Sequence, residues 1–402
     1  MRISTKSQMP FPFVTYPIIA TLMLYVFFYQ LAYPFSSTLF LYVAFAGAVA
    51  ILLFLSKIRI STQMIIMALV TVVSAIGVIY TKSPDEGSRE AVLTLVVWVM
   101  LISFAQNRIL LDRLKKTICI FSLIVFLGVL FQYLFPNMAN DIFRSILRKD
   151  SYEQLIRSFE VDGAYAGFSA YTPDAAYFCA ALFGFAIFGW LQGKGLSFTK
   201  KIMRIAVIVL SVFAIILTSK RGVAIALLVS FVITYMVWKK FSVKTIVSVI
   251  GLIVAATVLL YIFSEQNEEI GLFFRRFNAT DGDITTGRTE IWRNAWENLS
   301  NIFVGMGTGA SYSLYEMGLH NIYLQLLFDH GLIGLIIYLL FFASNLISAI
   351  KRNEPIAIYM QLLLLVYGFS GNPLYSNSFF IVYVIFSIVP LGDNIKQRQK
   401  TA

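Results

Sequence analysis

The sequence predicts an all-α integral membrane protein with about twelve transmembrane helices, and three observations lead to this class. Hydrophobic residues make up 58% of the 402 residues and charged residues only 13%, whereas soluble domains carry about 25% charged residues. Apolar runs of about 20 residues recur along almost the whole chain, and each can cross a ~30 Å hydrocarbon core as a helix. Basic residues gather in alternate connections between these runs. We therefore expect a single polytopic membrane domain over residues 1–402.

The apolar runs define the individual spans. The first run is expected to be retained as a span, because no A-x-A-like cleavage site follows it. Between the last two runs, Gly371, Asn372 and Pro373 interrupt the apolar pattern. The predicted spans are 14–34, 37–55, 62–80, 91–106, 117–135, 175–192, 203–219, 222–238, 245–263, 331–350, 355–372 and 377–391.

The charges predict the orientation of these spans. With a cytoplasmic N-terminus, the inside segments hold 20 of the 32 Lys and Arg residues and 3 of the 21 acidic residues, a net charge of +17. The outside segments hold the remaining 12 cations and 18 acids, a net charge of −6, and the two values sum to the overall +11. This asymmetry follows the positive-inside rule, so we expect both termini in the cytoplasm. The basic balance is thus a topology signal and does not indicate nucleic-acid binding.

Two outside segments are long enough to build a site. They are residues 136–174, the first long external loop, and residues 264–330, a large external loop between the ninth and tenth spans. No period of 20–50 residues indicates a repeat array. The two cysteines, Cys119 and Cys179, both lie in apolar runs, where small buried core residues are expected and no disulfide framework or cysteine metal site can form.

Two places in the outside segments carry cations that are candidates for binding a ligand, and the first of them goes against the positive-inside trend. Lys220 and Arg221 occupy the tight outward hairpin between the seventh and eighth spans, where the alternative is a solvated loop charge. Arg288 follows Gly287 at the start of TEIWRNAWENL, a predicted amphipathic helix. A helix N-terminus beside an arginine makes a phosphate-binding corner. The apolar face of this helix is predicted to hold Ile291, Trp292, Ala295, Trp296 and Leu299.

The end of the large loop carries a candidate base. His320 is predicted to open a short outer-surface helix whose apolar face holds Tyr323, Leu324 and Leu327, before the span that starts at Gly331. Histidine is the natural proton acceptor near neutral pH. The other histidine, His330, lies at the edge of that span.

Two other patterns in the large loop are expected to carry no ligand. The sequence GMGTG, residues 305–309, lacks a preceding strand and a Gly-Lys-Ser/Thr ending, so a flexible connector is expected rather than a phosphate loop. Asp281 and Asp283 are interpreted as a solvated acidic turn. The spacing of the two histidines does not suit a metal, so we expect neither a metal nor another cofactor.

The ordered set LTSKRG (Leu217 to Gly222), GRTEIW (Gly287 to Trp292), GMGTG and HNIYLQLLFDHGLIG (His320 to Gly334) resembles the bacterial O-antigen ligase and Wzy-type polysaccharide polymerase superfamily. The resemblance implies a GT-C-like, metal-independent, inverting glycosyltransferase of the bacterial cytoplasmic membrane, with its active site on the outer face. The implied donor is an undecaprenyl-diphosphate-linked glycan, and the acceptor is a glycan or a lipid-linked glycan. Membrane lipids and a chain-length regulator are further expected partners.

By resemblance, Arg221 and Arg288 fall on the arginines that bind the diphosphate, and His320 falls on the histidine that activates the acceptor hydroxyl. Lys220 stands where members often carry a small residue, and is a candidate second phosphate ligand. Further candidates for substrate binding are Arg157 in the first long loop and Arg276 and Trp292 in the large loop. The spacing from Arg157 to Gly167 is one residue short of the pattern in some polymerases.

Three functions remain open on the sequence alone. A polymerase and a ligase share the donor and differ in the acceptor, and we favour the polymerase because the SKRG form is more similar to capsule polymerases. A secondary transporter or a flippase for lipid-linked sugars also suits twelve spans. Coupled transporters carry ionisable residues near the bilayer midplane, and the interiors of these runs contain none.

Overall fold

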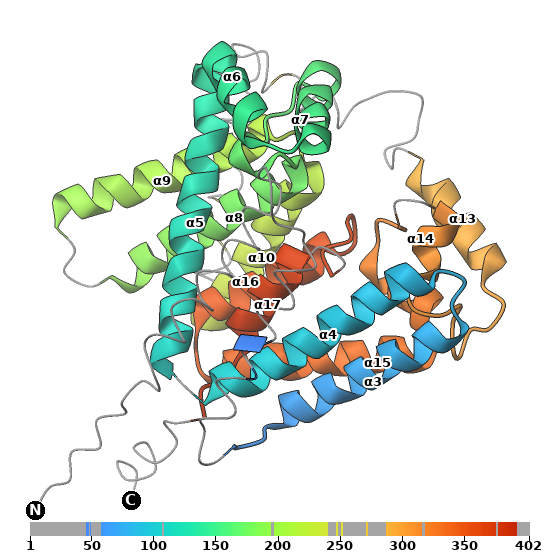
Figure 1. Ribbon diagram of the computed structural model, residues 1–402. Helices are drawn as coiled ribbons and strands as arrows, with labels where there is room; N and C mark the ends of the chain where they lie inside the picture. Colours follow the sequence, from blue (N-terminus) through green and yellow to red (C-terminus); the bar gives the residue numbers. More distant parts are fainter. Residues whose placement is uncertain are drawn as a thin grey trace, which may run out of the picture.

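The computed structural model describes residues 58–106, 108–193, 197–239, 287–315, 318–374 and 377–391, with a few isolated positions elsewhere. In this part of the chain all regular elements are helices, as the sequence predicts (Figure 1). Six of these helices are long and apolar enough to cross a membrane. They are α3 (Thr62–Tyr80), α4 (Pro84–Ala105), α5 (Arg108–Leu134), α8 (Thr172–Gln192), α10 (Arg221–Lys239) and α15 (Ile322–Lys351).

Three further apolar helices differ from simple spans. Helix α9 (Phe198–Leu217) carries Lys200, Lys201 and Arg204 in its first two turns. Helices α16 (Pro355–Tyr367) and α17 (Asn377–Ser387) have only 13 and 11 residues, whereas a span needs about 20. The predicted spans 14–34, 37–55 and 245–263 lie almost wholly outside the described residues. The number of twelve spans therefore stays a prediction.

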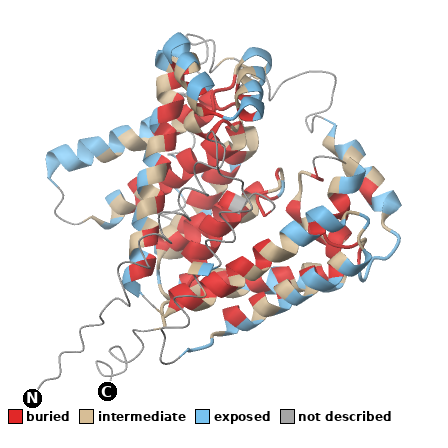
Figure 2. Cartoon of the chain, viewed as in Figure 1, coloured by how far each residue is buried: buried red, intermediate tan, exposed pale blue. Residues whose placement is uncertain are grey.

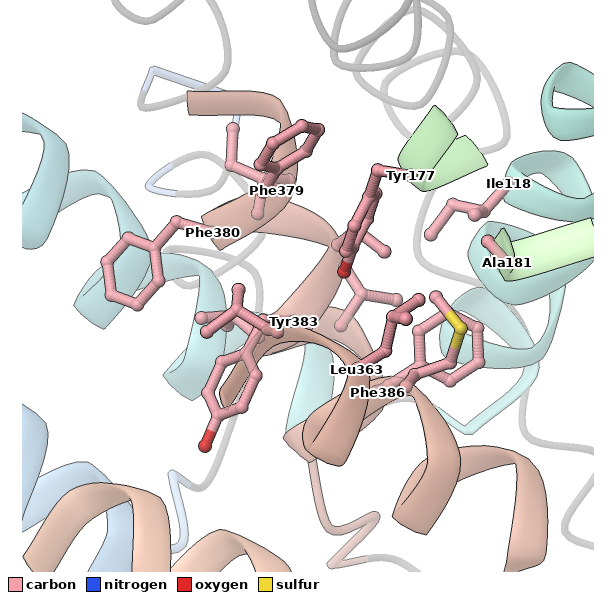
Figure 3. Packing of buried hydrophobic residues seen from close by; sticks show 14 of the residues in the cluster. Ile118, Tyr177, Ala181, Leu363, Phe379, Phe380, Tyr383 and Phe386 are labelled. Carbon is pink, nitrogen blue, oxygen red and sulfur yellow. The ribbon is translucent and has the colours of Figure 1, made fainter. Parts of the chain in front are cut away.

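The helices gather in two groups (Figure 1). Helices α3, α4 and α15 pack together, while α5, α8, α9 and α10 form the second group, and α16 packs against both α10 and α15. The buried side chains follow α8, α16 and α17, and the start of α9 is exposed (Figure 2). In this core the ring centroids of Tyr177 and Phe379 lie 4.3 Å apart (Figure 3). The Tyr359 hydroxyl donates to the Ala180 carbonyl at 2.9 Å.

The segment predicted as the first long external loop, residues 136–174, is largely helical. It forms α6 (Pro136–Ile146), α7 (Lys149–Asp162) and the short 3-10 helix η1 (Gly167–Ser169) at one end of α5. Ala139 and Phe143 are one helical turn apart on α6, and both are buried in a small separate core with Leu155. The i, i+4 spacing of these apolar residues gives α6 one buried face.

Helix α15 is broken at Gly331, which has φ 64° and ψ −170°. The break coincides with the start that the sequence predicts for the tenth span, although the apolar helix itself already begins at Ile322. The segment before the break, residues 322–330, is the predicted short helix. Its N-cap is Asn321, whose side chain accepts from the backbone N–H groups of Tyr323 and Leu324 at 3.0 and 3.1 Å.

Candidate functional site

The turn that follows α16, residues 367–372, is the place where the candidate site segments meet. The backbone N–H of Ile322 donates to the Gly368 carbonyl at 2.8 Å. The Arg288 guanidinium donates through Nη1 to the Ser370 carbonyl at 3.0 Å. Gly222 lies so close to the Ser370 side chain that any Cβ there would overlap it. The turn thereby holds the hairpin between α9 and α10, the start of α13 and the His320 segment together.

The hairpin that carries Lys220 and Arg221 is a tight turn between α9 and α10. Ser219 is buried and has φ 56°, a left-handed conformation that is uncommon for a residue with a side chain. Arg221 is the first residue of α10, and both cations are half-buried. The helix N-terminus adds its own partial positive charge to theirs.

Helix α13 (Arg288–Asn298) confirms the amphipathic helix predicted from TEIWRNAWENL. Gly287 precedes it with φ 83°, and Arg288 is its first residue. Ala295 is buried in a small core with Leu319, although Trp296, expected on the same face, is 56% exposed.

A second contact fixes α13 beside the candidate base. The indole Nε1 of Trp292 donates to the Leu319 carbonyl at 2.7 Å. Leu319 is the residue before His320, so this bond and the Arg288–Ser370 bond hold both ends of the same helical turn against the site. Trp292 therefore orients the segment that carries His320.

His320 is half-buried and has φ 52°, so the backbone is left-handed at the candidate base. Burial, then the charge of Arg288, then that of Lys220 lower the pKa of His320 to about 4. The sequence predicts that nearby cations disfavour protonation of His320. The cations do lower its pKa, but burial is the largest single cause. At neutral pH His320 is therefore a neutral imidazole with a free lone pair on one ring nitrogen.

The short helix after His320 buries a different face from the predicted one. Ile322, Gln325 and Asp329 are fully buried, while Tyr323 and Leu324, expected on the buried face, are only half-buried. At a membrane boundary apolar side chains tolerate lipid, whereas polar groups need partners inside the protein. Gln325 accepts from the Leu319 backbone N–H at 3.3 Å, which illustrates this preference.

The expectation of a flexible connector at GMGTG is wrong. The backbone N–H groups of Met306 and Gly307 donate to the carbonyls of Phe328 and Asp329, at 2.8 and 3.0 Å. These carbonyls lie just before the break at Gly331 and lose their helical partners there, because the N–H groups of Leu332 and Ile333 donate to Ile302 and Phe303 instead. Thr308, which is fully buried, donates through its hydroxyl to the Ser74 carbonyl at 2.7 Å.

The glycines explain why this loop fits. Gly305, Gly307 and Gly309 all have φ between 77° and 98°, and a Cβ on Gly307 would lie 2.7 Å from Thr81 Cα and 2.8 Å from the Gly77 carbonyl oxygen. The loop is thus a packed structural element that closes the broken end of α15 against α3.

The second histidine lies in a different environment from the first. His330 is 2% exposed and its ring stacks on Tyr338, with 5.7 Å between the ring centroids. Beside it, the Asp329 carboxylate accepts from the backbone N–H and the hydroxyl of Ser311, at 2.9 and 3.1 Å. Helices α4 and α15 begin at Pro84 and Ile322, earlier than the predicted spans 91–106 and 331–350. The ionisable residues Glu90, Asp329 and His330 therefore lie within helices and not in the connections before them.

Some predicted site residues are not brought together. Arg157 lies on the exposed surface of α7, and no contact within the described ranges joins it to Arg288 or His320. Arg276, Asp281 and Asp283 lie outside the described residues. In the part of the chain that the structure describes, no group of three or more His, Cys, Asp or Glu residues is arranged to hold a metal ion.

The turn at 367–372 is the part of the site that the sequence reasoning missed. Its signal in the sequence is the interruption of the apolar pattern by Gly371, Asn372 and Pro373, which by itself indicates only a boundary between two spans. A polar, glycine-containing break between apolar runs also marks backbone that turns at the membrane boundary, where its carbonyls are free to accept from other segments.

The fold and this cluster define a multi-pass helical membrane protein that gathers cations and a neutral histidine where its helices end. The model of the O-antigen ligase family matches residues 206–339, about a third of the chain. The resemblance to the O-antigen ligase and polysaccharide polymerase superfamily is therefore confirmed for the segment that holds Lys220, Arg221, Arg288 and His320. The chain gives no match among the curated proteins with which it was compared.

Proposed function

We propose that the protein is an inverting membrane glycosyltransferase that polymerises lipid-diphosphate-linked oligosaccharide repeat units into a surface polysaccharide, an O-antigen or a capsule. The donor is an undecaprenyl-diphosphate-linked glycan, and the reaction takes place at the outer face of the cytoplasmic membrane. One arrangement carries the proposal: the half-buried His320 lies within electrostatic range of Lys220 and Arg288. Helix α13 is held beside it by the bonds of Arg288 to Ser370 and of Trp292 to Leu319. This arrangement suits a diphosphate leaving group and an acceptor hydroxyl.

Each residue has a defined role in this reaction. The acceptor hydroxyl oxygen attacks the anomeric carbon of the donor sugar, and its proton passes to the free ring nitrogen of His320. The bond between the anomeric carbon and the diphosphate oxygen breaks, and undecaprenyl diphosphate departs with the electron pair. Arg288, Arg221 and Lys220 offset the negative charge that grows on that oxygen. Preorganised charges of this kind are usually the largest single contribution to such a rate.

Ligation is a second candidate function, because the matching family model is described as O-antigen ligase. A ligase transfers the same glycan to lipid A–core or to another surface acceptor, and the same cations and base serve it. Purified protein supplied with lipid-linked repeat units alone distinguishes the two functions. A polymerase extends the glycan under these conditions, whereas a ligase forms product only after a core acceptor is added.

The arginine chemistry provides the main test. Arg288→Ala is expected to abolish product formation, and Arg288→Lys to restore only part of it, because lysine lacks the bidentate fork that matches a phosphate. Arg293 is exposed on the same helix, so Arg293→Ala is the matched control and should stay close to wild type. Wild-type product from Arg288→Ala at equal protein abundance would remove Arg288 from the site.

Two further measurements test the setting of the site. A reporter fused after Gln266 should behave as exported, since residues 264–319 are proposed to be external; cytoplasmic behaviour contradicts the proposed sidedness. A chelator should leave the purified enzyme active, because the proposed mechanism uses no metal. Activity that is lost with EDTA and restored by a divalent ion would implicate Asp281 and Asp283.

A further inference from the structure

The cationic site lies beside an exposed aromatic side chain that the proposed reaction does not use. Phe369 is 60% exposed, and its ring lies 4.5 Å from that of Tyr323, centroid to centroid, at an interplanar angle of 41°. The Tyr323 hydroxyl donates to the Leu365 carbonyl at 2.8 Å, so this ring is fixed. Phe369 thus presents apolar surface from a rigid support.

This aromatic pair is continuous with the cations. The next residue along the chain, Ser370, accepts from Arg288 at its carbonyl and meets Gly222 of the cationic hairpin with its side chain. Phe369 therefore lies next to Ser370, which both cationic segments meet. A ligand that places an anion on the cations has an apolar surface within reach of its neighbouring groups.

The position along the helices indicates which end of the ligand lies there. Tyr323 is three residues after His320, in the direction in which α15 runs into its apolar span. Leu365 likewise precedes Phe369 by one turn, inside α16. The aromatic pair thus lies beside the candidate base where two apolar helices meet, at the start of α15 and just after the end of α16. Apolar area covered by a ligand contributes about 25 cal/mol per Å², which favours the apolar chain at this place.

We propose that Phe369, supported by Tyr323, binds the polyprenyl chain of the donor next to its diphosphate. This subsite rests on the proposed function, since it requires the diphosphate to lie on Arg288 and Lys220. A donor with an anionic head and an apolar tail is an amphiphile, and cations adjacent to a fixed aromatic surface recognise both parts at once. Phe369 then selects a polyprenyl diphosphate over a diphosphate without a chain.

The test compares two probes, farnesyl diphosphate and inorganic diphosphate, on the full chain in lipid nanodiscs. Phe369→Ser is expected to weaken binding of farnesyl diphosphate by about five- to tenfold, and to leave inorganic diphosphate binding unchanged. Phe369→Leu keeps apolar area and should lose less. Phe303 is 62% exposed on the loop before GMGTG, and its carbonyl accepts from the Ile333 N–H just beyond the other end of helix 322–330. Phe303→Ser is therefore the matched control for an exposed phenylalanine away from the cations.

The outcomes separate the subsite from the function on which it rests. Wild-type affinity of Phe369→Ser for farnesyl diphosphate overturns the subsite alone, and so does an equal loss in Phe303→Ser. Equal weakening of both probes in Phe369→Ser also overturns it, because the residue then acts on the diphosphate. If wild-type protein binds neither probe, and Arg288→Ala changes nothing, the diphosphate site fails and the subsite fails with it. Thermal unfolding of each variant shows whether the fold is retained.

Discussion

The two ends of the short helix 322–330 carry the two histidines of the chain, and their surroundings differ in charge, exposure and partners. At the first end, His320 is half-buried, and the charges of Lys220 and Arg288 act on its ring. At the second end, His330 is buried against Tyr338. The comparison teaches that the residue type alone assigns no role. An anionic substrate suits the first end, whereas the second end serves packing.

The largest expected effect separates the two histidines directly. His320→Ala should lower turnover by about 10²–10⁴-fold, the usual contribution of a positioned general base, and should keep donor binding. His330→Ala should keep turnover per folded molecule but lower stability, because it leaves a cavity in a packed site. Both are measured in one reconstituted assay, with thermal unfolding of each variant. An inactive His330→Ala beside an active His320→Ala would reverse the assignment, and two active variants would exclude a histidine base.

A second prediction concerns the packed end of the helix. Gly307→Ala is expected to destabilise the fold by about 2–4 kcal/mol, because the new methyl group meets Thr81 and the Gly77 carbonyl in addition to the strain of a positive φ. Gly287 also has a positive φ of 83° but has no atom within 4 Å of its Cβ position, so Gly287→Ala measures the strain alone, about 1 kcal/mol. Equal unfolding midpoints for the two variants would contradict the packed loop.

The smallest expected effect is on the pH dependence at the first end. Because the pKa of His320 is lowered to about 4, the base is neutral above this value and kcat/KM should be flat from about pH 8 to 5. Below the pKa the protonated ring cannot accept a proton, and kcat/KM should fall about tenfold per pH unit.

Lys220→Met sharpens the same measurement. Removing this positive charge raises the pKa of His320, so the acid limb of the profile should move to higher pH. An acid limb that stays at the same pH in Lys220→Met would show that Lys220 does not act on the base.

Much of the first end was predictable from the sequence. The start of α13 at Arg288 and the short helix after His320 follow from the position of Gly287 and from apolar periodicity. The sequence predicts that Arg288 and His320 lie close together only through the family resemblance. In the structure, the bond of Arg288 to Ser370 and the bond of Trp292 to Leu319 hold the two segments together.

The second end was not predictable in the same way. The role of GMGTG depends on carbonyls of Phe328 and Asp329 that only a break in α15 leaves free, and on a surface of α3 more than 200 positions away in sequence. The buried face of helix 322–330 was predicted wrongly for a related reason. Apolar periodicity identifies the buried face in water, but beside a membrane it equally marks the face that meets lipid.

The contact between the GMGTG loop and α3 can form only late in biosynthesis, because its two partners are far apart in the chain. The Thr308 hydroxyl bonds to the Ser74 carbonyl, 234 residues earlier in the chain. A ribosome adding about 5–20 residues per second needs roughly 10–50 s to make that intervening length. During this interval α3 and α4 are already synthesised, while the carbonyls of Ser74 and Gly77 have not yet met Thr308. The His330 end therefore packs against α3 late, only after most of the described apolar helices have been made.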